Sequence, residues 1–248
     1  MVELVPTGIS GLDDLLEGGI PARSAVLVSG RPGTGKTLFG MEYLYHGAAE
    51  LHEPGIMISY EETREDIRDA AHEIGLDDWA VLVESGDIIV HDKRDMLADQ
   101  GFSATVDRLL DVIQAREIDR FLLDSLSMFG LLFEEERDRR EYLLKFADIL
   151  KRNGLTALLI AEETGGLTDV DVGLENYLTD GNIRFIQTPT NRGVNRYVWV
   201  TKMRRSAADN DIFPMEISDD GITIHTAAGE YSLLDGPAFP GGGAGDGP

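Results

Sequence analysis

The stretch AVLVSGRPGTGKT at residues 25–37 decides the fold class of this chain. Its opening residues, 25–29, form an apolar run that predicts a buried strand. Gly30 to Thr37 then fit the pattern G-x-x-x-x-G-K-[ST] of a phosphate-binding loop between a strand and a helix. In such a loop the backbone N–H groups turn onto phosphate oxygens, and the helix dipole favours the bound anion. The stretch therefore predicts a nucleoside triphosphate site in an α/β domain.

The same pattern assigns roles to single residues. Lys36 is expected to reach the β- and γ-phosphates, and the hydroxyl of Thr37 to ligate Mg²⁺. Asp124 ends the apolar run 121–123, so we expect its carboxylate at the carboxyl edge of the sheet, holding Mg²⁺ through water. The alternative is a turn carboxylate that caps the segment after it. The residues expected to bind ATP are Gly30, Pro32, Gly33, Thr34, Gly35, Lys36, Thr37, Leu38 and Asp124.

Apolar runs alternate with helical periodicities up to residue 161, which is typical of a mostly parallel central sheet flanked by helices. The expected strands are 25–29, 56–60, 88–91, 120–124 and 155–161. The expected helices run from the glycine loop to about residue 50 and over 64–74, 103–116 and 138–151. Beyond residue 181, strand patterns predict a C-terminal antiparallel extension with strands at 182–187, 195–202, 215–217 and 222–226. We expect one domain over 1–234 and a disordered Gly- and Pro-rich tail over 235–248.

The composition limits the possible partners. The chain holds 45 Asp and Glu against 22 Lys and Arg, a formal net charge of −23, and this surface repels phosphate backbones. Nucleic acid is therefore not expected as a partner. Few of the basic residues are lysines, and an acidic, lysine-poor surface predicts adaptation to concentrated salt, which screens the self-repulsion. The alternative is an ordinary acidic cytosolic protein.

The sequence also lacks the features of disulfide-bonded, thiolate metal-binding, membrane-spanning and secreted proteins. There is no cysteine, so disulfides and thiolate metal sites are excluded. No apolar stretch has the length of a membrane span, and no signal peptide pattern opens the chain. A cytoplasmic location without membrane contact is expected.

Two carboxylates, Glu61 and Glu62, directly follow the expected strand 56–60. This position places them at the same edge of the sheet as the phosphate loop, where one of them could orient or deprotonate the attacking water. The alternative is a pair of favourable charges before a helix amino terminus, with Thr63 as the N-cap.

Two cations, Lys202 and Arg204, stand two residues apart at the end of an expected strand. A period of two would put both on one strand face, which suits a clamp on the γ-phosphate. The alternative is a solvated strand end on an acidic surface.

Together these residues resemble the KaiC-like branch of the RecA superfamily, from residue 7 to about residue 226. The segments TGISGLD (7–13) and GGIP (18–21) are similar to the part of the family that precedes its phosphate loop. Glu61-Glu62-Thr63 resembles the paired catalytic glutamates, and Asp124-Ser125 the Walker B site. Lys202-Met203-Arg204 resembles the Lys-x-Arg element that members project into the neighbouring subunit's active site.

The resemblance implies a RecA-like P-loop NTPase core that binds ATP and Mg²⁺ at subunit interfaces. It implies a ring-shaped homo-oligomer, usually a hexamer, with ATPase activity, a regulatory or signalling role and a protein partner that the sequence does not identify. The clock protein of this branch carries two such domains, whereas this chain carries one. The Ser-Thr pair of its autophosphorylating domain is matched here by Asn176-Tyr177, so the resemblance does not extend to autophosphorylation.

Two other classes of protein share the RecA-like core. A RecA/RadA-type recombinase would need a basic loop facing single-stranded DNA, but the segment 162–180 contains no Lys or Arg. The residues 131–140 do hold arginines, although glutamates precede them, and we interpret them as a solvated helix start. A nucleotide-sensing scaffold would bind ATP and assemble with little turnover, and a steady-state ATPase rate separates it from an enzyme.

Overall fold

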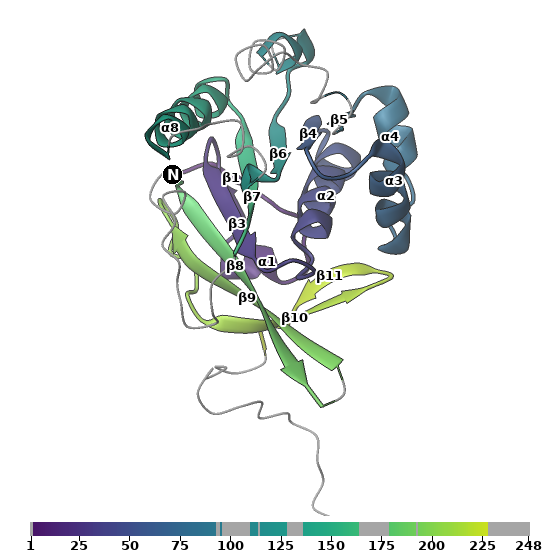
Figure 1. The fold of residues 1–248 in the computed structure, drawn as a ribbon, viewed down its shortest axis with the longest axis vertical. Coiled ribbons are helices and arrows are strands. Elements are labelled where there is room, and N and C mark those ends of the chain that lie inside the picture. The colour runs from purple at the N-terminus through teal and green to yellow at the C-terminus, as the bar shows by residue number, and fades with distance from the viewer. Residues whose placement is uncertain are drawn as a thin grey trace, which may run out of the picture.

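A computed structural model of the chain describes residues 2–92, 95, 110–113, 115–127, 136–163, 179–191 and 193–227. Its centre is a nine-stranded sheet in the order β11-β10-β9-β8-β3-β7-β6-β4-β5 (Figure 1). The strands from β8 to β5 run parallel to one another, and β9, β10 and β11 continue the sheet as antiparallel strands. The mostly parallel sheet and its antiparallel C-terminal extension are both confirmed.

The expected strands all form, with bounds that shift by a few residues. The sheet consists of β3 (Ala25–Gly30), β4 (Gly55–Ser59), β5 (Ile88–His91), β6 (Arg120–Asp124), β7 (Thr156–Glu162), β8 (Gly181–Thr190), β9 (Gly193–Met203), β10 (Ile212–Ser218) and β11 (Gly221–Ile224). A separate pair of two-residue strands consists of β1 (Leu4–Val5) and β2 (Ile20–Pro21).

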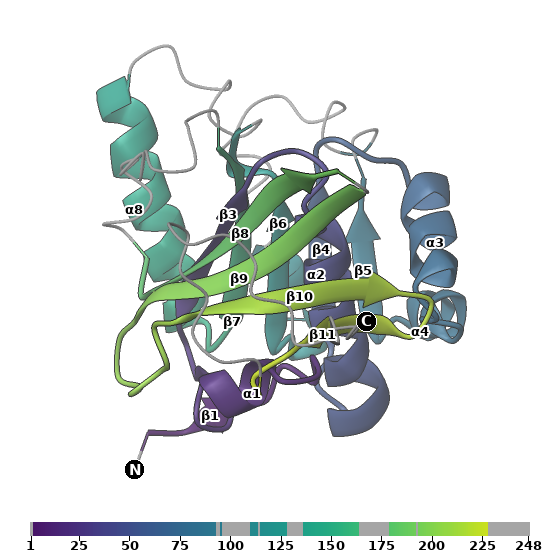
Figure 2. The same ribbon diagram turned by 90° about the horizontal axis from the view of Figure 1, so that it is seen from below.

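Helices cover both faces of the parallel strands, which explains why these strands are apolar throughout. Along β3, Val26 and Val28 pack into one hydrophobic cluster, whereas Ala25 and Leu27 pack into the other. Figures 1 and 2 show α8 on one side and α3 and α4 on the other. The helices are α1 (Leu12–Leu15), α2 (Lys36–His46) with the π-helix η1 (Gly47–Leu51), α3 (Arg64–Glu73), α4 (Trp79–Ser85) and α8 (Glu136–Arg152).

The helix α3 begins where the sequence predicts it. The hydroxyl of Thr63 accepts a hydrogen bond from the N–H of Asp66, and the Asp66 carboxylate accepts one from the N–H of Thr63. This reciprocal capping box satisfies two amide groups that the helix cannot bond itself. It fixes the chain direction immediately after Glu61 and Glu62.

The segment TGISGLD links the amino-terminal segment to the last strand of the sheet, β11. The Asp13 carboxylate accepts hydrogen bonds from the N–H groups of Thr7 and Gly8 and from the Thr7 hydroxyl. The carbonyl of Ser10 then accepts the N–H of Ile224 in β11. The motif therefore has a structural role in this chain, since it fixes the antiparallel extension to the amino-terminal segment.

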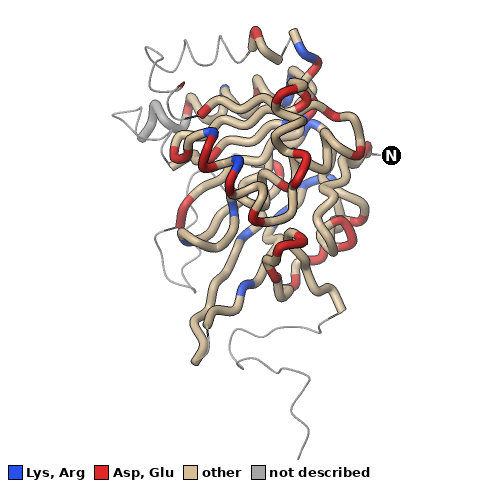
Figure 3. The backbone as a smooth tube through the Cα atoms, turned by 90° about the vertical axis from the view of Figure 1, so that its right-hand side faces the viewer, with Lys and Arg blue, Asp and Glu red and all other residues tan. Residues whose placement is uncertain are grey.

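Several predicted features fall on residues that the structure does not describe: the tail 235–248, the first part of the helix 103–116, residues 131–135 of the segment with arginines, and most of the segment 162–180, including Asn176-Tyr177. None of the helices in the described part of the chain is long and apolar enough to cross a membrane. Figure 3 shows Asp and Glu positions spread over the visible side of the backbone, with fewer Lys and Arg positions among them. Adaptation to concentrated salt stays a prediction.

Candidate functional site

The phosphate loop lies between the end of β3 and the start of α2, as predicted. Gly33 and Gly35 have φ angles of 77° and 99°, a left-handed region that favours glycine. A Cβ at Gly35 would also collide with the side chain of Ile217 in β10. Within the loop the carbonyl of Arg31 accepts hydrogen bonds from the Thr34 hydroxyl (2.9 Å) and from Nζ of Lys36 (3.0 Å). These bonds hold the loop in a compact turn with Lys36 folded over it.

Thr37 and Asp124 meet at the edge of the sheet. The Thr37 hydroxyl donates a hydrogen bond of 2.6 Å to Oδ2 of Asp124, which ends β6. Burial raises the pKa of Asp124 to about 6, the Thr37 hydrogen bond opposes the shift, and the charges of Glu61 and Glu62 add to it. A nearby cation would favour the carboxylate form.

Hydroxyl and carboxylate oxygens are ligands that Mg²⁺ prefers, so this pair fits a magnesium site. Among the described residues, no group of three or more His, Cys, Asp and Glu side chains could enclose a metal ion. The donor set therefore suits an ion that keeps several waters and completes its shell with substrate phosphates, which is the usual behaviour of Mg²⁺.

Glu61 and Glu62 follow β4, which pairs with β6 such that Ser59 lies opposite Asp124. The Ser125 hydroxyl donates a hydrogen bond of 2.6 Å to Oε1 of Glu61. The N–H of Glu62 donates to the Ser59 hydroxyl at 3.1 Å. The carboxylates are thus held at the same sheet edge as the Thr37–Asp124 pair.

These groups line one cleft of about 510 Å³. Its wall contains Pro32, Gly33, Gly35, Lys36, Thr37, Leu38, Glu61, Glu62, Ala70, Asp124, Ile160, Glu162, Arg196 and Ile217. Burial lowers the pKa of Lys36, and the charges of Glu162, Asp124, Glu61 and Glu163 oppose this shift. The cleft therefore combines one buried cation with several carboxylates beside an anion-binding loop.

Five residues of this cleft were not predicted from the sequence: Ala70, Ile160, Glu162, Arg196 and Ile217. Glu162 ends β7, whereas Arg196 and Ile217 come from the antiparallel strands β9 and β10. Nε of Arg196 is buried and makes no hydrogen bond to any residue that the structure describes. Glu162 could have been predicted as a cleft residue from its position at the end of an apolar run. The strand register that brings Arg196 to the cleft is not visible in the sequence.

Lys202 and Arg204 lie at the opposite end of the sheet. Gly181 of β8 pairs with Val26 near the start of β3 and also with Met203 at the end of β9. The phosphate loop begins at the other end of β3. The structure therefore does not bring Lys202 and Arg204 to the phosphate loop of their own subunit.

Lys202 lies in β9, and Arg204 follows one residue beyond the end of that strand. The register shift beside Asn182 and Ile183 lies before Lys202, so it does not separate the two cations, and their common strand face stays a prediction. Both cations contact the turn before β8. Nζ of Lys202 donates to the carbonyl of Thr179, and the N–H of Arg204 donates to the carbonyl of Asp180 at 2.9 Å.

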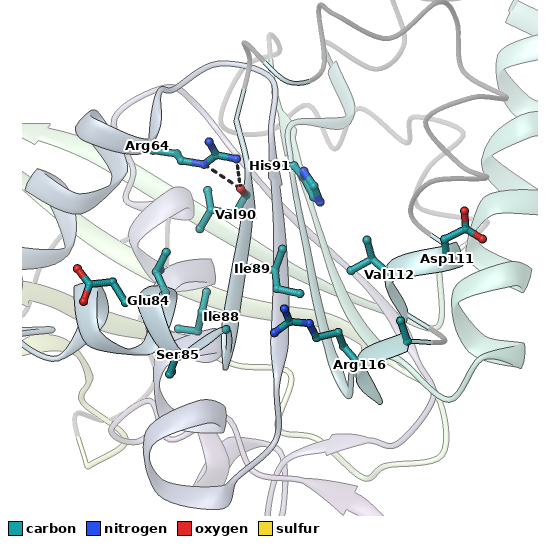
Figure 4. A pocket seen from close by; sticks show the side chains of 13 residues that line it. Arg64, Glu84, Ser85, Ile88, Ile89, Val90, His91, Asp111, Val112 and Arg116 are labelled. Atoms are coloured by element: carbon teal, nitrogen blue, oxygen red, sulfur yellow. Dashed lines mark hydrogen bonds between the residues drawn. The ribbon is translucent and has the colours of Figure 1, made fainter.

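A second cavity, of about 590 Å³, lies beside the edge strand β5 (Figure 4). The guanidinium of Arg64 donates two hydrogen bonds, of 3.1 and 2.9 Å, to the carbonyl of Val90 in this strand. A charged side chain over an edge carbonyl protects the strand from pairing with another chain. The cavity contains none of the predicted site residues.

Comparison with known proteins identifies the family of the chain. A family model described as "ATPase: KaiC" matches residues 5–229. The circadian clock protein KaiC2 of Synechocystis is 31% identical over 224 residues, which are 88% of this chain and 39% of that protein. The circadian clock oscillator protein KaiC of Synechococcus elongatus is 30% identical over 227 residues, or 88% and 43% of the two chains. The chain thus spans less than half the length of these curated relatives.

Among solved structures, the chain is similar to a KaiC-like protein from the hyperthermophilic archaeon Pyrococcus horikoshii. The TM-score is 0.81 at 33% sequence identity, with 91% of this chain and 100% of that chain covered. The match covers the whole of that protein, whereas it covers less than half of each clock protein.

Proposed function

Because the chain belongs to the KaiC ATPase family, we propose that it hydrolyses Mg-ATP at interfaces between identical subunits of a ring, usually a hexamer. Each interface joins the phosphate loop of one subunit to Lys202 and Arg204 of the next. One observation carries this arrangement: within a subunit the phosphate loop and the two cations lie at opposite ends of β3. A site that needs both groups is then completed by a second subunit.

At the phosphate loop, Lys36 binds the β- and γ-phosphates once nucleotide displaces its contact with the Arg31 carbonyl. The hydroxyl of Thr37 and, through water, the carboxylate of Asp124 hold the metal ion. When bound, Mg²⁺ neutralises charge on the phosphate oxygens. Arg196 adds a second cation to the binding wall, and its Nε is buried without a hydrogen bond to any described residue.

Glu61 is the proposed base. The Ser125 hydroxyl donates a hydrogen bond to its carboxylate and fixes it in the cleft, where it can orient a water molecule or accept its proton. Glu62 lies next to it in the same cleft and is the second candidate. The role of the ring in the cell is regulatory or signalling, exerted through a protein partner.

The test is phosphate release from Mg-ATP in molar KCl, with the mass of the protein measured by light scattering in parallel. Wild type is expected to release phosphate and to assemble, whereas Lys36→Ala should release no phosphate above background. Lys145→Ala is the matched control, because Lys145 is an exposed residue of α8 whose charged group contacts only Glu141 and Tyr142 of its own helix among the described residues. Assembly without phosphate release would indicate a nucleotide-sensing scaffold, and release by a stable monomer would contradict the interface.

A further inference from the structure

The turn that precedes β8 is fixed to the strand that carries the phosphate loop. The Asp180 N–H donates to the carbonyl of Ala25 at 2.8 Å, and Oδ2 of Asp180 accepts the Ala25 N–H at 3.1 Å. The same carboxylate accepts Nζ of Lys151, from the end of α8, at 3.1 Å. Asp180 is 8% exposed, so this carboxylate is held from two directions inside the protein.

Lys202 and Arg204, the two cations proposed to act on the neighbouring subunit, contact this turn. Arg204 donates its N–H to the carbonyl of Asp180, and its guanidinium lies 3.9 Å from Oδ1 of the same residue. The next residue, Arg205, is anchored to the Ser24 hydroxyl at 2.7 Å. The backbone around Arg204 is therefore fixed on both sides, whereas its side chain stays 58% exposed.

Asp180 also balances the charges of this end of the sheet. Lys151 and Arg204 approach its carboxylate directly. The pKa of Lys202 is lowered by burial and by repulsion from Arg204, and the charge of Asp180 opposes this shift. Without the carboxylate, three cations would repel one another and the exposed Arg204 side chain would lose its only ion pair among the described residues.

We propose that Asp180, held in place by Lys151, is the positioning residue that directs Arg204 and Lys202 toward the neighbouring subunit's phosphates. Asp180 itself touches no nucleotide in this arrangement. The inference rests on the proposed interface, since it explains what positions the two cations on one side of that interface.

The first variant is Asp180→Asn, which keeps the shape of the side chain and an oxygen for the Ala25 N–H but removes the charge. We expect kcat for ATP hydrolysis to fall by about 10- to 100-fold, the usual effect of misplacing a reacting group by a fraction of its size. KM should change little, because the phosphate loop of the variant is intact. Unchanged kcat in a folded variant would overturn the proposal.

Subunit mixing separates positioning from a merely structural role. Asp180→Asn subunits should regain activity when mixed with Lys36→Ala subunits, which supply intact cations. They should regain none with Arg204→Ala subunits, because both partners then lack correctly placed cations. The reverse pattern would mean that Asp180 acts on its own phosphate loop through β3, and it would overturn the proposal.

A second variant tests the same proposal if Asp180→Asn fails to fold. Lys151→Met removes the cation that holds the carboxylate, at a side chain that is 33% exposed. It should show the same mixing pattern as Asp180→Asn, whereas Lys145→Met on the same helix should behave as wild type. Full activity of Lys151→Met would contradict the role of Lys151. If Arg204→Ala and Lys36→Ala fail to complement each other, the proposed interface itself is wrong, which is a distinct result.

Discussion

The two ends of the parallel strands differ in charge and in shape. The carboxyl ends of β3, β4, β6 and β7 surround a cleft lined by Glu61, Glu62, Asp124 and Glu162. The amino end of β3 is bordered instead by Lys151, Lys202 and Arg204 around the Asp180 turn. The six residues of β3 separate these ends by about 20 Å, more than an arginine side chain spans. The comparison indicates two complementary half-sites that one subunit cannot join.

The largest expected effect comes from removing the cation of the amino end. Arg204→Ala should lower kcat by about 10³- to 10⁵-fold, because an arginine that stabilises the transferred phosphoryl group contributes that much to the rate. Binding of ATP should change much less, because an arginine that stabilises charge developing in the transition state contributes mainly to the rate. Single-turnover hydrolysis and equilibrium binding of a fluorescent ATP analogue measure the two quantities. Equal losses in both would place Arg204 in ground-state binding.

A smaller effect is expected at the carboxyl end from Glu61→Gln. The amide can still accept the hydrogen bond of Ser125, so the geometry is kept while the base is lost. Hydrolysis should fall by about 10²- to 10⁴-fold, the usual contribution of a general base, with normal ATP binding. Glu62→Gln is the parallel variant. Undiminished phosphate release from Glu61→Gln would move the base to Glu62.

Arg196 tests whether the antiparallel strands contribute to the cleft. Arg196→Met keeps most of the buried volume and removes the charge, so the Kd for ATP should rise by about 10- to 100-fold, the equivalent of one hydrogen bond to a charged group. The control is Arg68→Met, at an exposed residue of α3 that pairs with Asp69. Calorimetric titration measures both variants. Unchanged affinity in Arg196→Met would limit the binding site to the parallel strands.

The smallest effect per charged group is expected from salt, because salt screens the acidic surface as a whole. Because the net charge is −23, screening by KCl should raise the free energy of unfolding from low to molar concentration. For a chain of this size each kcal/mol raises the melting temperature by about 2–4 °C. Thermal melts across a KCl series check this. A flat melting temperature would remove the expected adaptation to concentrated salt.

Much of the fold was predictable because the buried parallel strands are continuous apolar runs and the phosphate loop has a specific pattern. Short elements were not: β1 and β2 are two-residue strands that only tertiary contacts define, and α4 is a seven-residue helix whose N-cap residue, Asp78, makes no side-chain capping hydrogen bond. The cleft residues Glu61, Glu62 and Asp124 follow strands and could be placed at one edge. Arg196 could not be, because only the pairing of β8, β9 and β10 decides which end of the sheet it reaches.

The most direct test of the two half-sites mixes Arg204→Ala subunits with Lys36→Ala subunits under conditions where subunits exchange. Each variant is expected to be inactive by itself. In the mixture, an interface can join the intact phosphate loop of one variant to the intact Arg204 of the other, so ATPase activity should partly return. Subunit exchange is confirmed by energy transfer between labelled subunits. If exchange occurs and activity stays at background, Arg204 does not act across the interface and the account is wrong.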